Sequence, residues 1–406
     1  MMSSSCNTHI HIAIPAMQEE LYLKDTLKSI EQQTYKNFTV WICINQADDW
    51  WLKDDKIHVC INNQNTLDYI NKINSTGSNI KVIDKSSKGK GWLGKQGGVG
   101  HARKILMDLI INNSDEKDII ISMDADTTFG KEYFQSIADI FSNNKKAVAI
   151  ANPYYHELSG IDSIDRSMLR YEIYMRSYTI NLLRIESPYA FAAFGSAIAF
   201  PVWAYKKING ITPKQSGEDF YLLQKLRKTG KIILSNDQVV SPATRVSDRV
   251  PFGTGPAIAK TVEEQQHSYP IFNPEYFDEI YATYLKFEEL FHRDVKTSMS
   301  DFLHIIFNNE DIFTPLRNNY KTVSQFVNAC HNKIDGLRIF QYLKWRSLNN
   351  KQNDVENLRK LFEKTGGNNT NVNLQTFNFL HSTINDINII RNQLFQIESR
   401  LRKQLK

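Results

Sequence analysis

The sequence contains few cysteines and no hydrophobic run long enough to cross a membrane. Its four cysteines form no Cys-x-x-Cys pair and no Cys/His pattern, which argues against a zinc site or a disulfide framework. The most membrane-like stretch, residues 189–205, is shorter than the roughly 20 residues that a spanning helix needs, and Gly195 and Pro201 interrupt it. Residues 1–7 lack the charged and apolar segments of a secretory signal. These absences predict a cytoplasmic protein.

Two common nucleotide-binding signatures are also missing. There is no Gly-x-x-x-x-Gly-Lys-Ser/Thr loop and no Gly-x-Gly-x-x-Gly turn directly after the first expected strand, which argues against kinase-like ATPases and dinucleotide dehydrogenases. The net charge of +5 is spread over 406 residues, unlike the clustered basic stripe of a nucleic-acid-binding protein. A phosphate-bearing ligand or an anionic membrane surface is compatible with it. With 41% hydrophobic residues, the chain can bury a large core and is long enough for two folded units.

One apolar run ends in two carboxylates that lie one residue apart. Residues 119–123 are followed by Asp124 and Asp126, and the run predicts a covered strand of a mixed or parallel sheet. Ligands bind at the carboxyl ends of such strands. Because side chains alternate along an extended backbone, both carboxylates could contact one divalent cation. The alternative is a solvated turn, where Asp is common for backbone reasons.

The pattern around this run predicts alternating strands and helices. Residues 9–15 alternate and stop at Pro15, which predicts a first strand that closes into a loop. A helix is expected over 17–35 and a second strand over 38–45, so that the two strands are parallel and joined by a right-handed crossover. Further strands are expected at 80–84, 119–123, 147–151 and 238–241, and further helices at 105–110, 129–141, 169–185 and 219–226.

Residues 86–104 are rich in glycine and lysine and lead into one of these helices. Glycine lets the backbone approach a ligand closely, and a helix start with nearby Lys and Arg favours a diphosphate. The alternative is a surface loop. A second candidate loop, 245–255, contains Arg245 and Arg249 and suits contact with phosphate or an anionic acceptor, unless it only connects two domains.

In their order along the chain, these motifs resemble the family 2 glycosyltransferases of the GT-A fold over about residues 9–260. The motifs that carry the resemblance are residues 12–20, 29–38, 98–104, 123–126, 195–200 and 216–226. The resemblance implies an α/β fold with a mixed, mainly parallel sheet in a catalytic domain at 1–260, and the helical texture of the remaining sequence predicts an α-helical domain at 261–406. It also implies a nucleotide-diphosphate sugar donor and Mn²⁺ or Mg²⁺, with Asp126 and Asp124 as metal ligands.

The resemblance and the two loops together suggest residues for each role. The expected donor-binding residues are Pro15, Glu19, Asn45, Lys95, Arg103, Asp124, Gly195, Ser196, Arg245 and Arg249. In inverting members of the family, the Asp of a Glu-Asp pair is the general base, which makes Asp219 the candidate base and Glu218 the candidate ligand of the acceptor hydroxyl. The alternative for this pair is helix capping, because acids are favoured in a first turn.

The expected function is therefore a metal-dependent, inverting transfer of a sugar to a saccharide, a lipid-linked or a small-molecule acceptor. A retaining transferase and a non-catalytic nucleotide-sugar-binding protein stay open as alternatives. A nucleotidyltransferase is disfavoured because residues 15–20 contain no Gly-rich loop. Peripheral membrane contact is compatible with the basic end at 400–406, and no nucleic-acid partner is expected.

Two departures from the family pattern affect the donor site. The second strand ends in Asn45 where the family often has Asp, so the base-reading residue is either Asn45 or Asp48, and the nucleobase is undetermined. No His follows residues 238–241, so the metal is expected to bind Asp126, Asp124 and phosphate oxygens.

The sequence after residue 260 changes in character. It contains only three of the 18 glycines and is expected to be helical, with a helix start at Asn273, Pro274 and Glu275. The aromatic residues that follow are expected to form a core.

Overall fold

The computed structural model describes most of the chain, in two compact units. The described residues are 8–75, 77, 80–94, 96–215, 217–246, 254–260, 264–265, 268–348, 353–367 and 372–404. The first unit comprises Met1–Ile164 and Ala193–Ala259, and the second comprises Asp165–Ala192 and Lys260–Lys406. Residues 165–192 thus belong with the C-terminal part of the chain. The division into separate domains at 1–260 and 261–406 stays a prediction.

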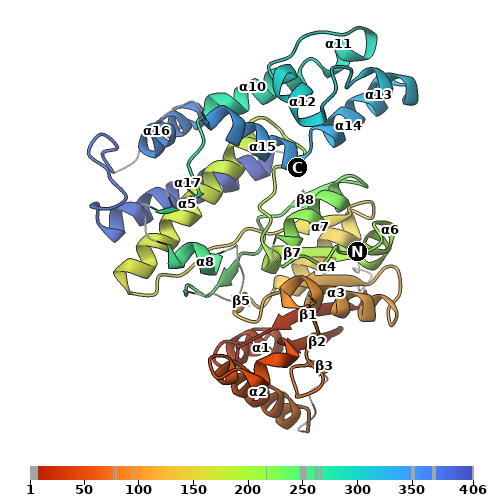
Figure 1. Ribbon diagram of the computed structural model, residues 1–406, viewed down its shortest axis with the longest axis vertical. Helices are drawn as coiled ribbons and strands as arrows, with labels where there is room; N and C mark the ends of the chain where they lie inside the picture. Colours follow the sequence, from red (N-terminus) through yellow and green to blue (C-terminus); the bar gives the residue numbers. More distant parts are fainter. Residues whose placement is uncertain are drawn as a thin grey trace, which may run out of the picture. The chain divides into compact units, whose positions relative to one another are not determined.

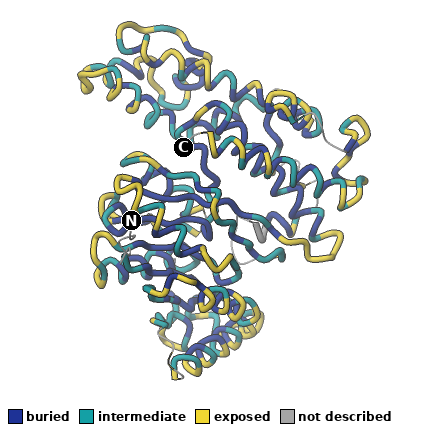
Figure 2. Tube along the Cα trace, turned by 180° about the vertical axis from the view of Figure 1, so that it is seen from behind, coloured by how far each residue is buried: buried dark blue, intermediate teal, exposed yellow. Residues whose placement is uncertain are grey.

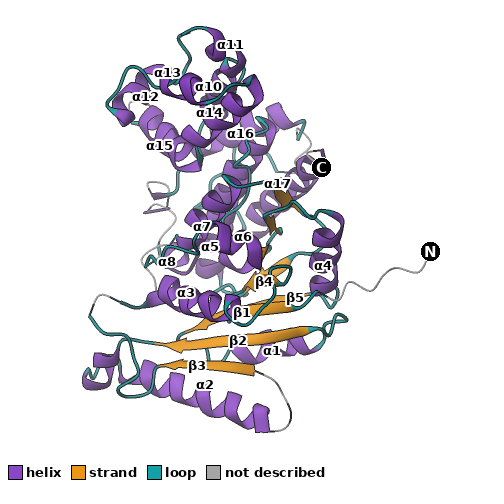
Figure 3. Ribbon diagram, turned by 90° about the vertical axis from the view of Figure 1, so that its right-hand side faces the viewer, coloured by secondary structure: helices purple, strands orange, loops and turns teal. Residues whose placement is uncertain are grey.

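The first unit contains a seven-stranded sheet with strand order β3-β2-β1-β4-β7-β6-β8. Figure 3 shows the first four of these strands in that order. Strands β1 to β4 are parallel, whereas β7 runs antiparallel to both of its neighbours, β4 and β6. The strands are β1 Ile10–Ala16, β2 Phe38–Asn45, β3 Ile80–Lys85, β4 Ile119–Ser122, β6 Ala149–Ala151, β7 Ile198–Pro201 and β8 Ile232–Leu234, with β5 Thr127–Phe129 and β9 Val240–Pro242 forming a separate pair. The expected mixed, mainly parallel sheet is confirmed.

Helices cover both faces of this sheet. Right-handed crossovers place α1 and α2 on one face and α3 on the other (Figure 3). Strands β1 and β4 are buried along their whole length, and Ile119, Ile120 and Ile121 of β4 are almost fully inaccessible. Figure 2 shows buried residues throughout the interior of this unit. The helices of this unit are α1 Leu23–Glu31, α2 Ile57–Ser75, α3 Gly98–Ile111, α4 Tyr133–Asn143, α6 Val202–Lys207, α7 Glu218–Arg227 and α8 Thr254–Ala259, with 3-10 turns η1 Asp48–Leu52 and η2 Gly195–Ala197.

Three expected elements differ from the structure. The helix expected over 17–35 begins only at Leu23, because Gln18 has a positive φ of 59° and the Glu19 carbonyl accepts the amide protons of Tyr22 and Leu23. Pro15 does not end the first strand but pairs with Cys43 of β2. The helix expected over 129–141 starts at Tyr133, since Thr127–Phe129 pairs with β9 instead. Strand β8 was not predicted.

The second unit is helical (Figure 1). Helix α10 begins as expected: the Asn273 side chain accepts the amide proton of Glu275 at 3.0 Å, and Pro274 occupies the first turn. None of the helices within the described residues is long and apolar enough to cross a membrane. The helices of this unit are α5 Asp162–Arg184, α10 Pro274–Tyr284, α11 Phe287–His292, α12 Ser300–Phe307, α13 Thr314–Asn319, α14 Val323–Lys333, α15 Gly336–Ser347, α16 Asp354–Thr365 and α17 Ile384–Gln404.

The long helix α5 carries buried arginines that pair with carboxylates from distant parts of the sequence. Arg176 pairs with Glu172 of the same helix and with Glu398 of α17 at 2.6 Å, and Arg170 pairs with Asp354 at the start of α16. All five side chains are at most 4% exposed. Because buried charges are tolerated only when paired, these contacts tie α5 to α16 and α17 within the second unit.

Candidate active site

The candidate active site lies where the direction of chain progression in the sheet reverses. Strands β1 and β4 are adjacent and parallel, but β1 leads through α1 to β2 on one side, whereas β4 lies on the other. Glu19 follows β1, and Asp124 and Asp126 follow β4. Pro15 is buried inside β1. The carboxyl ends of parallel strands at such a reversal are the usual ligand site of an open α/β sheet.

Arg103 connects the carboxylates of this site. It lies on α3 with only 3% of its side chain exposed, and its guanidinium donates to Asp124 and pairs with Glu218 at 3.1 Å. Burial alone lowers the pKa of Arg103, but Asp124, Glu218 and Asp219 together raise it above its ordinary value. One guanidinium thus faces three carboxylates, and the group carries excess negative charge.

Two glycines give Arg103 and Glu218 the space to meet. A Cβ at Gly195 would lie 2.3 Å from Nη1 of Arg103, so only glycine lets the guanidinium pass this turn. A Cβ at Gly100 would lie 2.1 Å from the carbonyl oxygen of Lys214. The second glycine therefore lets the segment before Glu218 lie against the first turn of α3.

Ser196 fixes the orientation of Asp124. Its hydroxyl donates to Oδ2 of Asp124 at 2.6 Å and accepts the Asp124 amide proton at 3.2 Å. The hydroxyl of Thr127 donates to the same Ser196 oxygen at 2.9 Å. Ser196 was expected beside the donor sugar, whereas in the structure it holds a carboxylate; its contact with a donor stays a prediction.

Glu218 and Asp219 form the first turn of α7, directly after Gly217, which has a left-handed φ of 71°. Glu218 is buried and Asp219 is partly buried. Burial and the negative charge of Glu218 together raise the pKa of Asp219 to about 7, although Arg103 opposes both. Burial also raises the pKa of Glu218. The structure therefore brings together the expected base, its neighbour and Asp124 around Arg103, and gives Asp219 a pKa suited to proton transfer near neutrality.

Arg245 binds the second carboxylate of the Asp-x-Asp motif. Its Nε and Nη2 atoms donate to Oδ2 of Asp126 at 3.0 and 2.6 Å, and Nη2 also lies 2.7 and 2.8 Å from the two carboxylate oxygens of Glu19. The guanidinium lies 4.1 Å from the ring centre of Tyr22, a residue expected only as a helix position. Burial lowers the pKa of Arg245, but Asp126 and Glu19 raise it above its ordinary value.

Asn45 makes contacts within the protein at both ends of its amide. Its Nδ2 donates to the Ala16 carbonyl at 3.0 Å, and its Oδ1 accepts the indole proton of Trp92 at 3.1 Å. The contact ties the end of β1 to the Gly-rich segment through Trp92, which the sequence did not single out. The expected role of Asn45 at the nucleobase stays a prediction. Lys95 and Arg249, two further expected donor ligands, lie outside the described residues.

The carboxylates of the Asp-x-Asp motif fit the chemistry of a Mn²⁺ or Mg²⁺ ion, which prefers hard oxygen ligands. However, Asp124 is bound by Arg103 and Asp126 by Arg245. Within the described residues, no group of three or more His, Cys, Asp or Glu side chains is arranged to hold a metal. A metal at Asp126 would therefore need phosphate oxygens or water among its ligands, and Arg245 would have to move.

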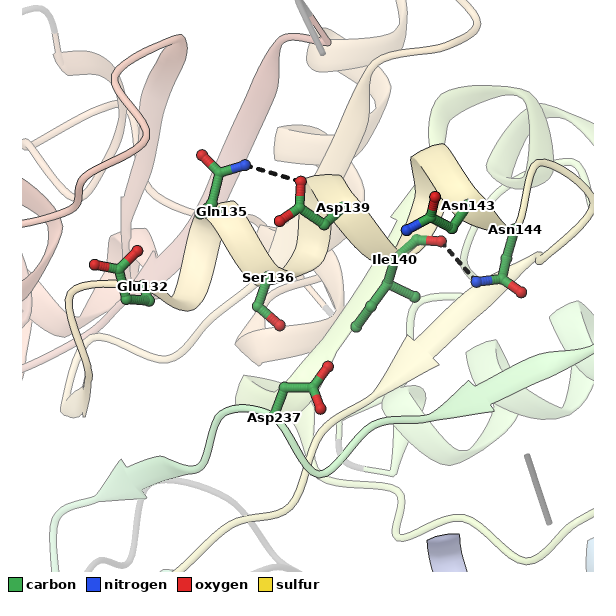
Figure 4. A pocket seen from close by; sticks show the side chains of 8 residues that line it. All are labelled: Glu132, Gln135, Ser136, Asp139, Ile140, Asn143, Asn144 and Asp237. Atoms are coloured by element: carbon green, nitrogen blue, oxygen red, sulfur yellow. Dashed lines mark hydrogen bonds between the residues drawn. The ribbon is translucent and has the colours of Figure 1, made fainter. Parts of the chain in front are cut away.

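A cavity of about 400 Å³ lies elsewhere in the first unit (Figure 4). It is lined by α4 and by Asp237, whose side chain faces the helix (Figure 4). Three carboxylates line it, from Glu132, Asp139 and Asp237, and none of the expected site residues does.

Residues 11–201 match the family described as glycosyl transferase family 2. They include the strands from β1 to β7, the Asp-x-Asp motif, Arg103 and Ser196. Over this range the sequence matches glycosyl transferase family 2, the family that the sequence motifs resemble. The family and the mixed sheet confirm the expected GT-A-type fold. Glu218, Asp219 and Arg245 lie beyond the matched residues of this family 2 region, so their roles are proposals.

Similarity to individual proteins is weak. Comparison with curated protein sequences finds no match. Among solved structures, Staphylococcus aureus TarS 1-349 in complex with UDP-GlcNAc is 15% identical with a TM-score of 0.42, over 88% of this chain and 92% of that one. The mannosyltransferase PcManGT from Pyrobaculum calidifontis, in complex with GDP-Man and Mn²⁺, is 10% identical with a TM-score of 0.40, over 96% and 85%.

Proposed function

We propose that this protein is a cation-dependent, inverting glycosyltransferase that moves a sugar from a nucleotide-diphosphate donor to an acceptor hydroxyl. The observation that carries the proposal is the position of Asp219 and Glu218 in the first turn of α7, where Arg103 pairs with Glu218 and with Asp124 of the Asp-x-Asp motif. Burial and the charge of Glu218 raise the pKa of Asp219. A general base needs a pKa near the working pH. The match of residues 11–201 to family 2 supports the reaction class.

In the proposed reaction, the oxygen of the acceptor hydroxyl forms a bond to the anomeric carbon of the donor sugar while the bond between that carbon and the diphosphate breaks. Asp219 accepts the proton that the hydroxyl loses. Glu218, held by Arg103, accepts a hydrogen bond from the acceptor. Ser196 and Arg103 hold Asp124 in place. One direct displacement needs only one base, so the configuration inverts; a covalent retaining route would need a carboxylate nucleophile instead.

The excess of negative charge supports dependence on a cation. A diphosphate approaching Asp124, Asp126, Glu218 and Asp219 would be repelled unless positive charge were added. A divalent cation held by Asp126 and Asp124 would neutralise the negative charge that develops on the leaving diphosphate. The proposed location is cytoplasmic.

The test is a thermal-shift panel of UDP, GDP, dTDP and CMP sugars, with and without Mn²⁺. At a hundredfold its dissociation constant, a ligand adds about 2.7 kcal/mol to stability, which is a shift on the order of 5 to 10 °C for a unit of this size. We expect one nucleotide class to stabilise the wild type only with Mn²⁺. Asp126→Ala should lose this shift, and the control Asp237→Ala, in the cavity on α4, should keep it.

If no sugar nucleotide shifts the wild type, the donor assignment is wrong. A sugar nucleotide could also raise the melting temperature while neither the wild type nor Asp219→Asn releases nucleotide with any acceptor tried. This outcome would favour a non-catalytic nucleotide-sugar-binding protein.

A further inference from the structure

Arg245 contacts both Asp126 and Glu19. One nitrogen, Nη2 of Arg245, lies 2.6 Å from Asp126 and 2.7 Å from Glu19. Both carboxylates therefore contact the same positively charged group from two different parts of the chain. The three side chains are at most 16% exposed, so little water screens the two carboxylates from each other.

We propose that Arg245 and a divalent cation compete for the pair formed by Asp126 and Glu19. Glu19 is then a further cation ligand, and Arg245 is a built-in cation that occupies the position until a metal replaces it. The proposal rests on the proposed function, which places a metal at Asp126, and extends it to Glu19 and Arg245.

The geometry requires a positive charge at this position. Two carboxylates so close together and so little exposed repel one another unless a cation lies between them. The guanidinium supplies this charge with two donors to Asp126, contacts to both oxygens of Glu19, and the face of Tyr22 behind it.

Arg245 and a metal cannot use these oxygens together. Nε and Nη2 both point at Oδ2 of Asp126, and Nη2 lies against both oxygens of Glu19. A divalent ion bound to the same oxygens would lie in contact with the guanidinium, and the two positive charges would repel. In the absence of donor, the affinity for a metal therefore depends on the free energy needed to release Arg245 from the two carboxylates.

The test measures Mn²⁺ binding to the full chain without donor, by the EPR signal of free Mn²⁺. Arg245→Gln removes the competitor and should bind Mn²⁺ at least tenfold more tightly than the wild type. Lys206→Gln removes one positive charge from the exposed surface of α6 and should bind like the wild type. Adding Glu19→Gln to Arg245→Gln should abolish the gain, because it removes one of the two proposed ligands.

A second readout follows stability. Without metal, Arg245→Gln leaves the buried Glu19 and the partly buried Asp126 with no guanidinium between them, so its melting temperature should fall. Mn²⁺ should then raise the melting temperature of Arg245→Gln more than that of the wild type. If Arg245→Gln does not fold, Arg245→Lys replaces it, since a lysine keeps the charge but loses the forked contact and should also bind Mn²⁺ more tightly than the wild type.

The proposal is overturned if the Arg245 variant binds Mn²⁺ no more tightly than the wild type, or if the Glu19 substitution leaves the gain unchanged. In either case the proposed function stands as long as the wild type is stabilised by a sugar nucleotide. If no variant binds Mn²⁺ but sugar nucleotides still stabilise the protein, the competition is refuted and the donor site remains. Loss of the sugar-nucleotide shift in the wild type would contradict the proposed function itself.

Discussion

A buried arginine pairs with a carboxylate in each unit, but the two carboxylates differ in their exposure. In the second unit, Arg170 and its partner Asp354 are both at most 4% exposed. In the first unit, Arg103 is equally buried, whereas 36% of the side chain of its partner Asp124 is exposed. The guanidinium is fixed from behind, and the carboxylate faces outward.

The difference separates two uses of the same chemistry. A fully buried pair joins parts of the backbone and is costly to break. A pair with one exposed carboxylate keeps that carboxylate charged and oriented while leaving it available to a substrate or a cation. Substitutions around the two kinds of pair should separate these uses, and the one with the largest expected effect comes first.

Asp219→Asn should give the largest loss of activity. Asparagine keeps the shape of the side chain but cannot accept the proton, and general bases contribute about 10²- to 10⁴-fold to rates. We expect nucleotide release from the stabilising donor to fall by about this factor, with the donor-induced thermal shift unchanged. The control is Asp237→Asn. Activity within a few-fold of wild type would show that Asp219 is not the base, and a product of retained configuration would favour the retaining alternative.

Arg170→Met should destabilise the second unit by about 3–5 kcal/mol, because it leaves Asp354 buried without a cation. Asp354 would keep the hydrogen bond from the Ile271 amide at 2.9 Å. Chemical denaturation measures the change. Lys360→Met breaks a more exposed pair with Glu275 and should cost less than about 1 kcal/mol. Adding Asp354→Leu to Arg170→Met should recover stability; if it does not, the charge pair is not the cause.

Gly195→Ala should displace Arg103 from the first unit's carboxylates. The new Cβ would lie 2.3 Å from its guanidinium, and overpacking of this kind costs about 1–3 kcal/mol. We expect a lower melting temperature and a weaker donor-induced shift. Gly130→Ala, whose Cβ would meet only the end of the Gln238 side chain at 3.0 Å, should do neither. Equal behaviour of the two variants would argue against the close approach at Gly195.

The pH dependence should show the smallest effect. The base acts only when deprotonated, so a raised pKa of about 7 for Asp219 predicts that kcat/KM falls about tenfold per pH unit below neutrality. Glu218→Gln removes the negative charge that raises this pKa, so the acidic limb should move to lower pH even if the maximal rate falls. A limb that stays in place would show that Asp219 does not control it.

The sequence predicted the sheet and the position of its two carboxylates because these depend on local pattern. The apolar run at 119–123 can only be a covered strand or a buried helix, and its length and the following Asp-x-Asp decide for the strand. The start of α1 was placed too early because residues 17–22 have helical apolar spacing, whereas Gln18 adopts a left-handed φ that no spacing reveals.

The connections among the site residues could not be predicted in the same way. Arg245 reaches Glu19 across 226 positions of sequence, and nothing local to either residue specifies the other. The burial of Arg103 depends on the absence of a side chain at Gly195, which lies on another element. Residue types and motif order therefore indicated the site, while tertiary packing determined which residue pairs with which.

Helix α5 also affects the order in which the chain can fold during synthesis. Arg176 is translated 222 residues before Glu398, its partner on α17. At about 5–20 residues per second, a ribosome needs roughly 10 to 45 s to cover that distance. Throughout this interval Arg176 lacks its partner on α17, whereas strands β7 to β9 of the first unit all emerge before Glu398 does. The second unit is thus the last part of the protein to become stable, and a nascent chain at this stage presents a natural substrate for chaperones.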